Sequence, residues 1–369
     1  MNTWIWLYMI TMFIPIGILL IFGPYFTRKT VSFGVSISEE IYYSPIVRGL
    51  RKQYAILTAV ILAVLLAGSI TLLVGNRDAI EMVFPISIIA MIVLSILQYL
   101  YFHNRMKKLK AAHNWNAQQL SRVAIDLTTR KKSVISNWWY LLYVAIIAGC
   151  FFFTLSNYDI IPNQIAMKFD FNGNVTKMSD KSYGVVFMPQ IIQLFMLALF
   201  IIINYTIRAS KQIIDVSKPE VSKKQNLAFR RRSSVLMFIS GLSMTLLFGP
   251  IQWNFVYPMD VQMMNYIIHF FVMITIFGCL WLAISTGQGG SRIAALDDQT
   301  GSGQYFKNDD AYWKLGVVYI NSNDPAIIVE KRVGIGWTLN MGNPISWISL
   351  LGLLALIAGV AIYAAVVGA

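Results

Sequence analysis

Hydrophobic residues gather in long unbroken runs along this chain instead of alternating with polar positions. A helix that crosses a bilayer needs about 20 mostly apolar residues, because each residue adds about 1.5 Å across a hydrocarbon layer about 30 Å thick. Runs of this length predict an all-α polytopic membrane protein with about eight transmembrane helices. The predicted helices cover residues 4–23, 54–74, 80–102, 138–156, 185–207, 234–251, 262–285 and 345–367.

Composition and charge agree with a membrane protein. Of all residues 57% are hydrophobic and 13% are charged, and the mean hydropathy is +0.60. The net charge of +13 comes from 30 Lys and Arg, of which 26 lie in the segments 24–53, 103–137, 208–232 and 286–344. Cytoplasmic loops carry such an excess, so we expect these segments inside and both termini outside a bacterial plasma membrane. The basic residues form no face of a soluble module, and we expect no direct nucleic-acid binding.

The alternation of apolar and polar segments divides the chain into five regions. Before the last helix, two β-rich runs, 317–321 and 326–329, flank a turn at 322–325 and predict a small cytoplasmic β-hairpin module. The regions are an N-terminal three-helix membrane region at 1–137, a helix pair flanking a folded extracytoplasmic loop (157–184) at 138–207, a basic loop and helix pair at 208–285, a cytoplasmic linker with the hairpin module at 286–344, and the last helix at 345–369.

The outward loop at 157–184 is the most informative segment for function. It has a proline at its entry, Pro162, then a short extended piece and an Asn-Gly turn at Asn172 and Gly173. A loop with this turn chemistry predicts an ordered cap, and ordered loops on a rigid scaffold commonly carry recognition. The polar side chains expected to contribute to recognition are Lys168, Asp170 and Lys181.

Chemistry inside the bilayer rests on few residues. The polar groups that mark a possible intramembrane site are His269, Asn204 and Gln193. A water-filled path lined by them would indicate the alternative function, a transporter component or small-molecule exporter. No protease constellation, metal-ligand spacing or phosphate-binding glycine motif stands out, so we expect no enzyme activity, catalytic residue, metal or cofactor.

Residues 159–189 resemble the extracytoplasmic segment of the Sdp immunity protein family of Gram-positive membrane proteins. The shared pattern is a proline, an extended piece, an Asn-Gly turn, then Asp or Lys and a helix containing proline. This chain has Lys168 where members typically carry His, and Asp170 where they usually carry Asn. Residues 305–344, with Trp313 and Trp337, resemble a second short module of unknown function that accompanies such proteins.

The resemblance implies a protein that protects against, or senses, a secreted membrane-active peptide or envelope stress. The implied partners are the lipid bilayer, a peptide toxin outside, and a cytoplasmic regulator or ABC transporter inside. Recognition would fall to Pro162, Lys168, Asp170, Asn172, Gly173 and Lys181 outside, and to Trp313 and Trp337 inside.

Overall fold

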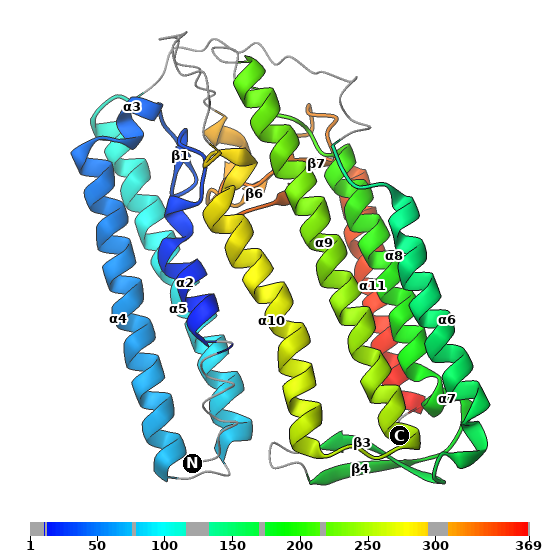
Figure 1. The fold of residues 1–369 in the computed structure, drawn as a ribbon. Coiled ribbons are helices and arrows are strands. Elements are labelled where there is room, and N and C mark those ends of the chain that lie inside the picture. The colour runs from blue at the N-terminus through cyan, green and yellow to red at the C-terminus, as the bar shows by residue number, and fades with distance from the viewer. Residues whose placement is uncertain are drawn as a thin grey trace. The chain divides into compact units, whose positions relative to one another are not determined.

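The computed structural model describes residues 11, 13–75, 79–115, 133–169, 174–214, 219–293 and 309–367. These residues fall into two compact units. The first contains residues 1–133, 207–233 and 280–347, and the second contains 134–206, 234–279 and 348–369. Each unit is built of long helices with short strand pairs (Figure 1).

Seven helices of the described chain are long and apolar enough to cross a membrane, which confirms a multi-pass membrane protein. The first predicted helix, 4–23, is represented by the shorter α2 (Ile14–Phe22), and residues 1–10 and 12 lie outside the described part. The seven long helices are α4 (Pro45–Gly75), α5 (Ile80–Ala112), α6 (Leu141–Ser156), α8 (Met188–Ala209), α9 (Pro219–Val256), α10 (Val261–Ser285) and α11 (Pro344–Val367).

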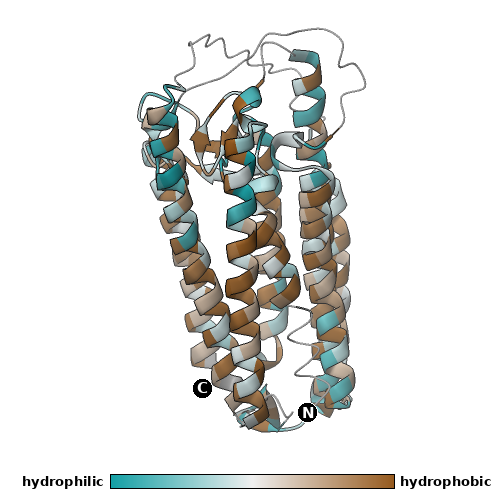
Figure 2. Cartoon of the chain, turned by 90° about the vertical axis from the view of Figure 1, so that its left-hand side faces the viewer, coloured by the Kyte–Doolittle hydropathy of each residue, from teal (hydrophilic) through white to brown (hydrophobic). Residues whose placement is uncertain are grey.

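Several helices are longer than their apolar runs. Helix α4 begins at Pro45 rather than at 54, and α9 begins at Pro219 rather than at 234. A proline is well suited to the first turn of a helix, and the basic residues that follow are good helix formers, so both helices continue into polar sequence. In Figure 2 the long helices are mostly hydrophobic (brown) along their length and become hydrophilic (teal) toward their ends.

In the first unit, α2, α4 and α5 pack side by side with the short hairpin β1 (Val31–Ser32) and β2 (Val35–Ser36). The hairpin turn places Phe33 and Gly34 at positive φ, 48° and 74°. The positive φ of Phe33 strains the backbone, and burial of its side chain offsets this strain. Phe33 is 1% exposed, and its ring stacks on Phe102 with ring centres 5.4 Å apart. The hairpin is thereby fixed against the helix pair.

The C-terminal strands of the first unit form two hairpins rather than the single predicted one. Strand β5 (Trp313–Lys314) pairs with β6 (Val318–Tyr319), and β7 (Ile328–Glu330) pairs with β8 (Trp337–Leu339). The predicted turn at 322–325 does not join paired strands, because its backbone is bonded by the side chain of Asn340 instead of by a strand ladder. We call residues 23–44, 207–214, 286–293 and 309–343 together the loop module.

The second unit contains α6, one hairpin, and residues 188–206 of α8, 234–256 of α9, 261–279 of α10 and 348–367 of α11. Tyr140 and Tyr143 donate hydrogen bonds to the carbonyls of Phe200 and Phe238, at 3.2 and 2.5 Å, and so join α6 to α8 and α9. A Cβ at Gly241 would lie 2.5 Å from the Phe200 ring, so only glycine allows this close helix approach.

Candidate functional site

The predicted cap between α6 and α8 is a two-stranded β-hairpin. Strand β3 (Gln164–Phe169) runs antiparallel to β4 (Val175–Asp180), with register shifts on both sides of Lys168. Residues 170–173 lie outside the described part of the chain, and with them the predicted recognition residues Asp170, Asn172 and Gly173. The extended piece that the sequence predicts is therefore present, while its turn is not described.

The hairpin is seated on a small hydrophobic cluster. Lys181 follows β4 and donates from Nζ to the carbonyl of Ile161 at 2.9 Å, with its ammonium 4.6 Å from the centre of the Tyr158 ring. Lys181 thus anchors the cap, whereas Pro162 is exposed at its entry. The buried members of the cluster are Ile161, Ile165, Val185, Val186 and Val256.

The hairpin exposes both positive charge and apolar side chains. Lys168 and Lys177 are direct partners across the two strands, and both are exposed. Beside them Phe169, Val175 and Met178 are 43%, 46% and 49% exposed. Two like charges placed opposite each other destabilise a sheet, so this pair is not explained by the stability of the hairpin.

Gln193 belongs to a closed polar cluster between helices of the second unit. Its amide donates to the carbonyl of Thr245 at 2.9 Å and accepts from Gln252 at 3.3 Å. Gln190 donates to Thr154 at 3.0 Å and to Gln252 at 3.2 Å. All of these side chains are buried, and the hydrogen bonds of their amide groups link α6, α8 and α9.

Asn204 lies three turns further along α8 in a separate group. It donates to Asn137 at 2.9 Å and accepts from Ser234 at 2.6 Å. The described contact of His269 is within its own helix, where Nδ1 lies 2.7 Å from the carbonyl oxygen of Asn265. The three predicted intramembrane residues are buried, but the described contacts do not bring them into one site.

The two predicted tryptophans of the inner surface are packed within the loop module. Trp313 is 9% exposed and lies under the guanidinium of Arg332, 5.1 Å from it. Trp337 packs against Phe229 of α9 with ring centres 4.9 Å apart. A partner at this surface would therefore meet the neighbours of these rings rather than their full faces.

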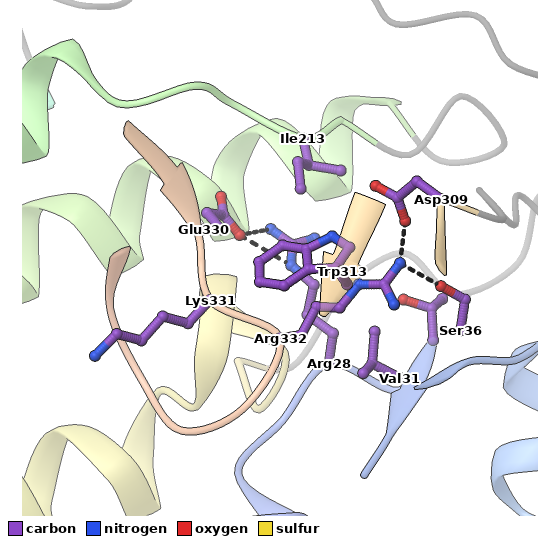
Figure 3. Close-up of a pocket in the computed structure, with 10 residues that line it drawn as sticks. Arg28, Val31, Ser36, Ile213, Asp309, Trp313, Glu330, Lys331 and Arg332 are labelled. Atoms are coloured by element: carbon purple, nitrogen blue, oxygen red, sulfur yellow. Dashed lines mark hydrogen bonds and ion pairs between the residues drawn. The ribbon is translucent and has the colours of Figure 1, made fainter. Parts of the chain in front are cut away.

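Charged side chains from distant segments meet around a cavity of about 100 Å³ in the loop module (Figure 3). Arg28 donates through Nε to Glu330 at 3.0 Å, and Arg332 donates to the Gly34 carbonyl at 2.8 Å and to Ser36 at 2.7 Å. Arg332 also forms ion pairs with both Asp309 and Asp310. Lys331 also lines the cavity, but its side chain extends away from the charged network in Figure 3.

Asp310 joins two segments of the loop module to helix α5, and its pKa reflects this position. Burial alone would raise the pKa, but Arg332, Lys110 and the backbone N–H of Ser36 stabilise the carboxylate and lower the pKa to about 2. Lys110 lies 2.7 Å from one carboxylate oxygen, and the Ser36 N–H donates to the other at 3.0 Å. The carboxylate is therefore a structural anion and is not suited to proton transfer near neutral pH.

Protonation of Asp310 at low pH should lower the free energy of unfolding. A carboxyl whose pKa falls from 3.8 to about 2 on folding stabilises the protein above about pH 4, and this stability is lost as the pH falls through the folded pKa. Lowering the pH from about 4 to about 2 should thus cost wild type about 2 kcal/mol more than Asp310→Asn. Thermal unfolding of the detergent-solubilised protein measures this difference, and an Asp159→Asn control at an exposed carboxyl should behave like wild type.

The sequence pattern did not single out Arg28, Asp310, Glu330 or Arg332. Arg28 and Glu330 are separated by 302 positions, so only the fold brings them together. The available signal was the mixture of acidic and basic residues within β-rich sequence at 309–332, where acids are at least as frequent as bases, unlike in the mainly basic segments elsewhere. Among the described residues, no group of three or more His, Cys, Asp and Glu side chains could hold a metal ion.

Two segments of the chain match families described only as of unknown function. Residues 145–192, which contain the β3–β4 hairpin, match the domain of unknown function DUF1648. Residues 322–347, in the loop module, match the family of unknown function DUF5808. Comparison with curated proteins and with solved structures gives no match. Both matches are consistent with an uncharacterised membrane family, and the resemblance to the Sdp immunity family stays a prediction.

Proposed function

We propose that this chain is a multi-pass bacterial plasma-membrane protein of immunity or signal-sensing type. In this proposal, the β3–β4 hairpin recognises a secreted membrane-active peptide outside the cell, and the loop module meets a cytoplasmic regulator inside. The bias of Lys and Arg toward the four basic segments supports this orientation. The observation that carries the proposal is the opposed pair Lys168 and Lys177 on the exposed face of the hairpin.

The geometry of the hairpin suits an extended peptide. Each strand pairs with only one other within the described residues, so each has an edge with free backbone donors and acceptors. An extended peptide can add to such an edge, and its side chains then meet the hairpin face. An acidic group on the peptide would relieve the repulsion between Lys168 and Lys177, while apolar residues would cover Phe169 and Met178.

The alternative of a transporter receives no support from the described polar groups. A path for solutes would need polar side chains that face water within the membrane. Gln193 and Asn204 are instead 0% and 1% exposed, and each is hydrogen-bonded within a closed group. These contacts are those of side chains that hold helices together.

The test is protection of a bacterial strain that lacks the gene. The strain is complemented with wild type or with the double variant Lys168→Gln/Lys177→Gln and exposed to a panel of secreted membrane-active peptides. Wild type should raise the inhibitory concentration of at least one peptide, and the double variant should not. Loss of each charged contact should also weaken binding of that peptide by about tenfold, measured on purified protein.

A neighbouring position supplies a control of equal charge change. Thr176→Glu and Lys177→Gln each lower the net charge by one, but the register passes from Lys177 directly to Val175, so Thr176 has no partner in β3 and does not lie opposite Lys168. Thr176→Glu should therefore protect like wild type and Lys177→Gln should not. Equal loss in both variants would assign the effect to overall charge, and unchanged sensitivity of the deletion strain to every peptide would contradict the immunity function itself.

A further inference from the structure

A second and larger cavity lies in the first unit, beside the start of α4. Its volume is about 760 Å³, within the range of small-molecule sites. Five basic side chains line it, and Glu39 is the one acidic residue among the lining residues. The basic residues are Arg28, Lys29, Arg48, Arg51 and Arg292.

Among the residues that the structure describes, carboxylate partners are found for two of these five cations. Arg28 pairs with Glu330, and Lys29 lies 3.6 Å from Glu39. Within the described part of the chain, Arg48, Arg51 and Arg292 form no ion pair. Three guanidinium groups around one cavity thus give it a positive charge that no carboxylate of the described residues pairs with, which favours an anion.

Arg51 is the clearest sign that the cavity is built for a ligand. The residue is 3% exposed, and its Nη2 donates to the Tyr42 carbonyl at 2.9 Å. Its Nε and Nη1 are buried without a hydrogen-bond partner. A buried guanidinium with unsatisfied donors is costly, so a shift of Arg51 toward an oxyanion in the cavity it lines would be favourable.

Aromatic rings hold the cationic side chains in place. The Arg51 guanidinium lies 3.6 Å from the centre of the Tyr42 ring and 5.5 Å from that of Tyr25. Arg48 lies 5.4 Å from the Tyr43 ring centre. These residues sit where α4 passes from basic into apolar sequence, and tyrosine and arginine are typical of the headgroup level of a bilayer.

We propose that this cavity binds a phosphate group, carried either by the headgroup of an anionic phospholipid or by a soluble phosphate ester. The paired N–H donors of an arginine guanidinium match the spacing of phosphate oxygens. Basic pockets beside transmembrane helices bind acidic headgroups. Gly289 lines the same cavity at φ +62°, where a Cβ would lie 2.3 Å from the Arg28 guanidinium. Glycine there leaves room for the cation. The site is separate from the β3–β4 hairpin and does not depend on its function.

The experiment uses the purified full-length protein in a mild detergent. The protein is mixed with equal amounts of phosphatidylglycerol and phosphatidylcholine, and native mass spectrometry counts the lipids that stay bound. A parallel arm measures thermal stability with added glycerol 3-phosphate. Preference for phosphatidylglycerol supports a lipid source, whereas stabilisation by glycerol 3-phosphate without lipid preference supports a soluble source.

Matched double variants test whether the cavity is responsible. Arg48→Gln/Arg292→Gln removes two exposed cations that line it, and Lys52→Gln/Arg105→Gln removes two exposed cations that do not. The first variant should weaken binding of the preferred phosphate compound by about tenfold or more, and the second should bind it like wild type. Arg51→Gln should lose binding as well, and its melting temperature without ligand reports whether it still folds.

Two results would overturn the proposal. One is a wild-type protein that neither prefers phosphatidylglycerol nor gains stability from glycerol 3-phosphate. The other is equal loss of binding in the two double variants, because this would mean that the anion responds to the general positive charge of the surface and not to the cavity.

Discussion

Replacing Arg332 with methionine should lower the free energy of unfolding by about 3–5 kcal/mol. The side chain bonds to the Gly34 carbonyl and to Ser36, and it pairs with Asp309 and Asp310. Methionine has a similar volume but no charge, so the Asp309 and Asp310 carboxylates both lose their ion pair with the Arg332 guanidinium. The measurement is unfolding of the full chain in mixed micelles, followed by circular dichroism.

The next residue is a direct control for Arg332. Lys331 is exposed and its side chain extends away from the charged network, so Lys331→Ala removes an equal charge just after the same strand. Its effect should stay within about 0.5 kcal/mol, as for other surface substitutions. Similar stability of the two variants would mean that the network around Arg332 does not stabilise the loop module.

Replacing Asn340 with leucine should destabilise the protein by about 3 kcal/mol or more. The side chain is fully buried and donates to the carbonyls of Asn321, Asp324 and Ala326 at 2.9 to 3.1 Å. Its oxygen accepts from the backbone N–H of Asn321 and of Gly342, both at 3.0 Å. Leucine has a similar volume but leaves these buried backbone groups unpaired. The same micelle titration measures the loss.

The turn at 322–325 contains a second asparagine, Asn323, which serves as an exposed control for the replacement of asparagine by leucine. Asn323→Leu places leucine where the side chain is exposed, and it should change stability by no more than about 0.5 kcal/mol. Asn340→Asp separates shape from bonding, because it keeps the volume and loses the amide donors. A wild-type stability for Asn340→Asp would contradict the role assigned to those donors.

Helix number could be predicted from the sequence because burial in lipid demands long apolar runs. The helix ends could not, since α4 and α9 continue into polar sequence that a hydropathy pattern reads as loop. An ordered cap with a short extended piece was predicted at 157–184, and two paired strands lie there, while the predicted Asn-Gly turn falls on residues outside the described part of the chain. The pairing of β5 to β8 was wrong in detail, because Asn340 determines the turn at 322–325 from a later part of the chain.

The candidate sites show the same division between local and distant information. Lys168 was identified from its loop, but its pairing with Lys177 depends on the register of the hairpin. Arg51 was counted only as part of a basic loop, because nothing in one sequence shows that its guanidinium is buried among tyrosines. Gln193 was identified as polar within an apolar run, and its partners Gln252 and Thr245 lie on another helix.

The distance between Arg28 and Glu330 has a consequence for biosynthesis. A ribosome adds about 5–20 residues per second, so the 302 positions between them correspond to roughly 15–60 s of translation. During that time Arg28 lacks Glu330 and Ser36 lacks Arg332, although Phe33 of the hairpin turn can already pack against Phe102. Nascent chains stalled before residue 309 should therefore expose the N-terminal loop to proteases, and chains that extend past Asn340 should protect it.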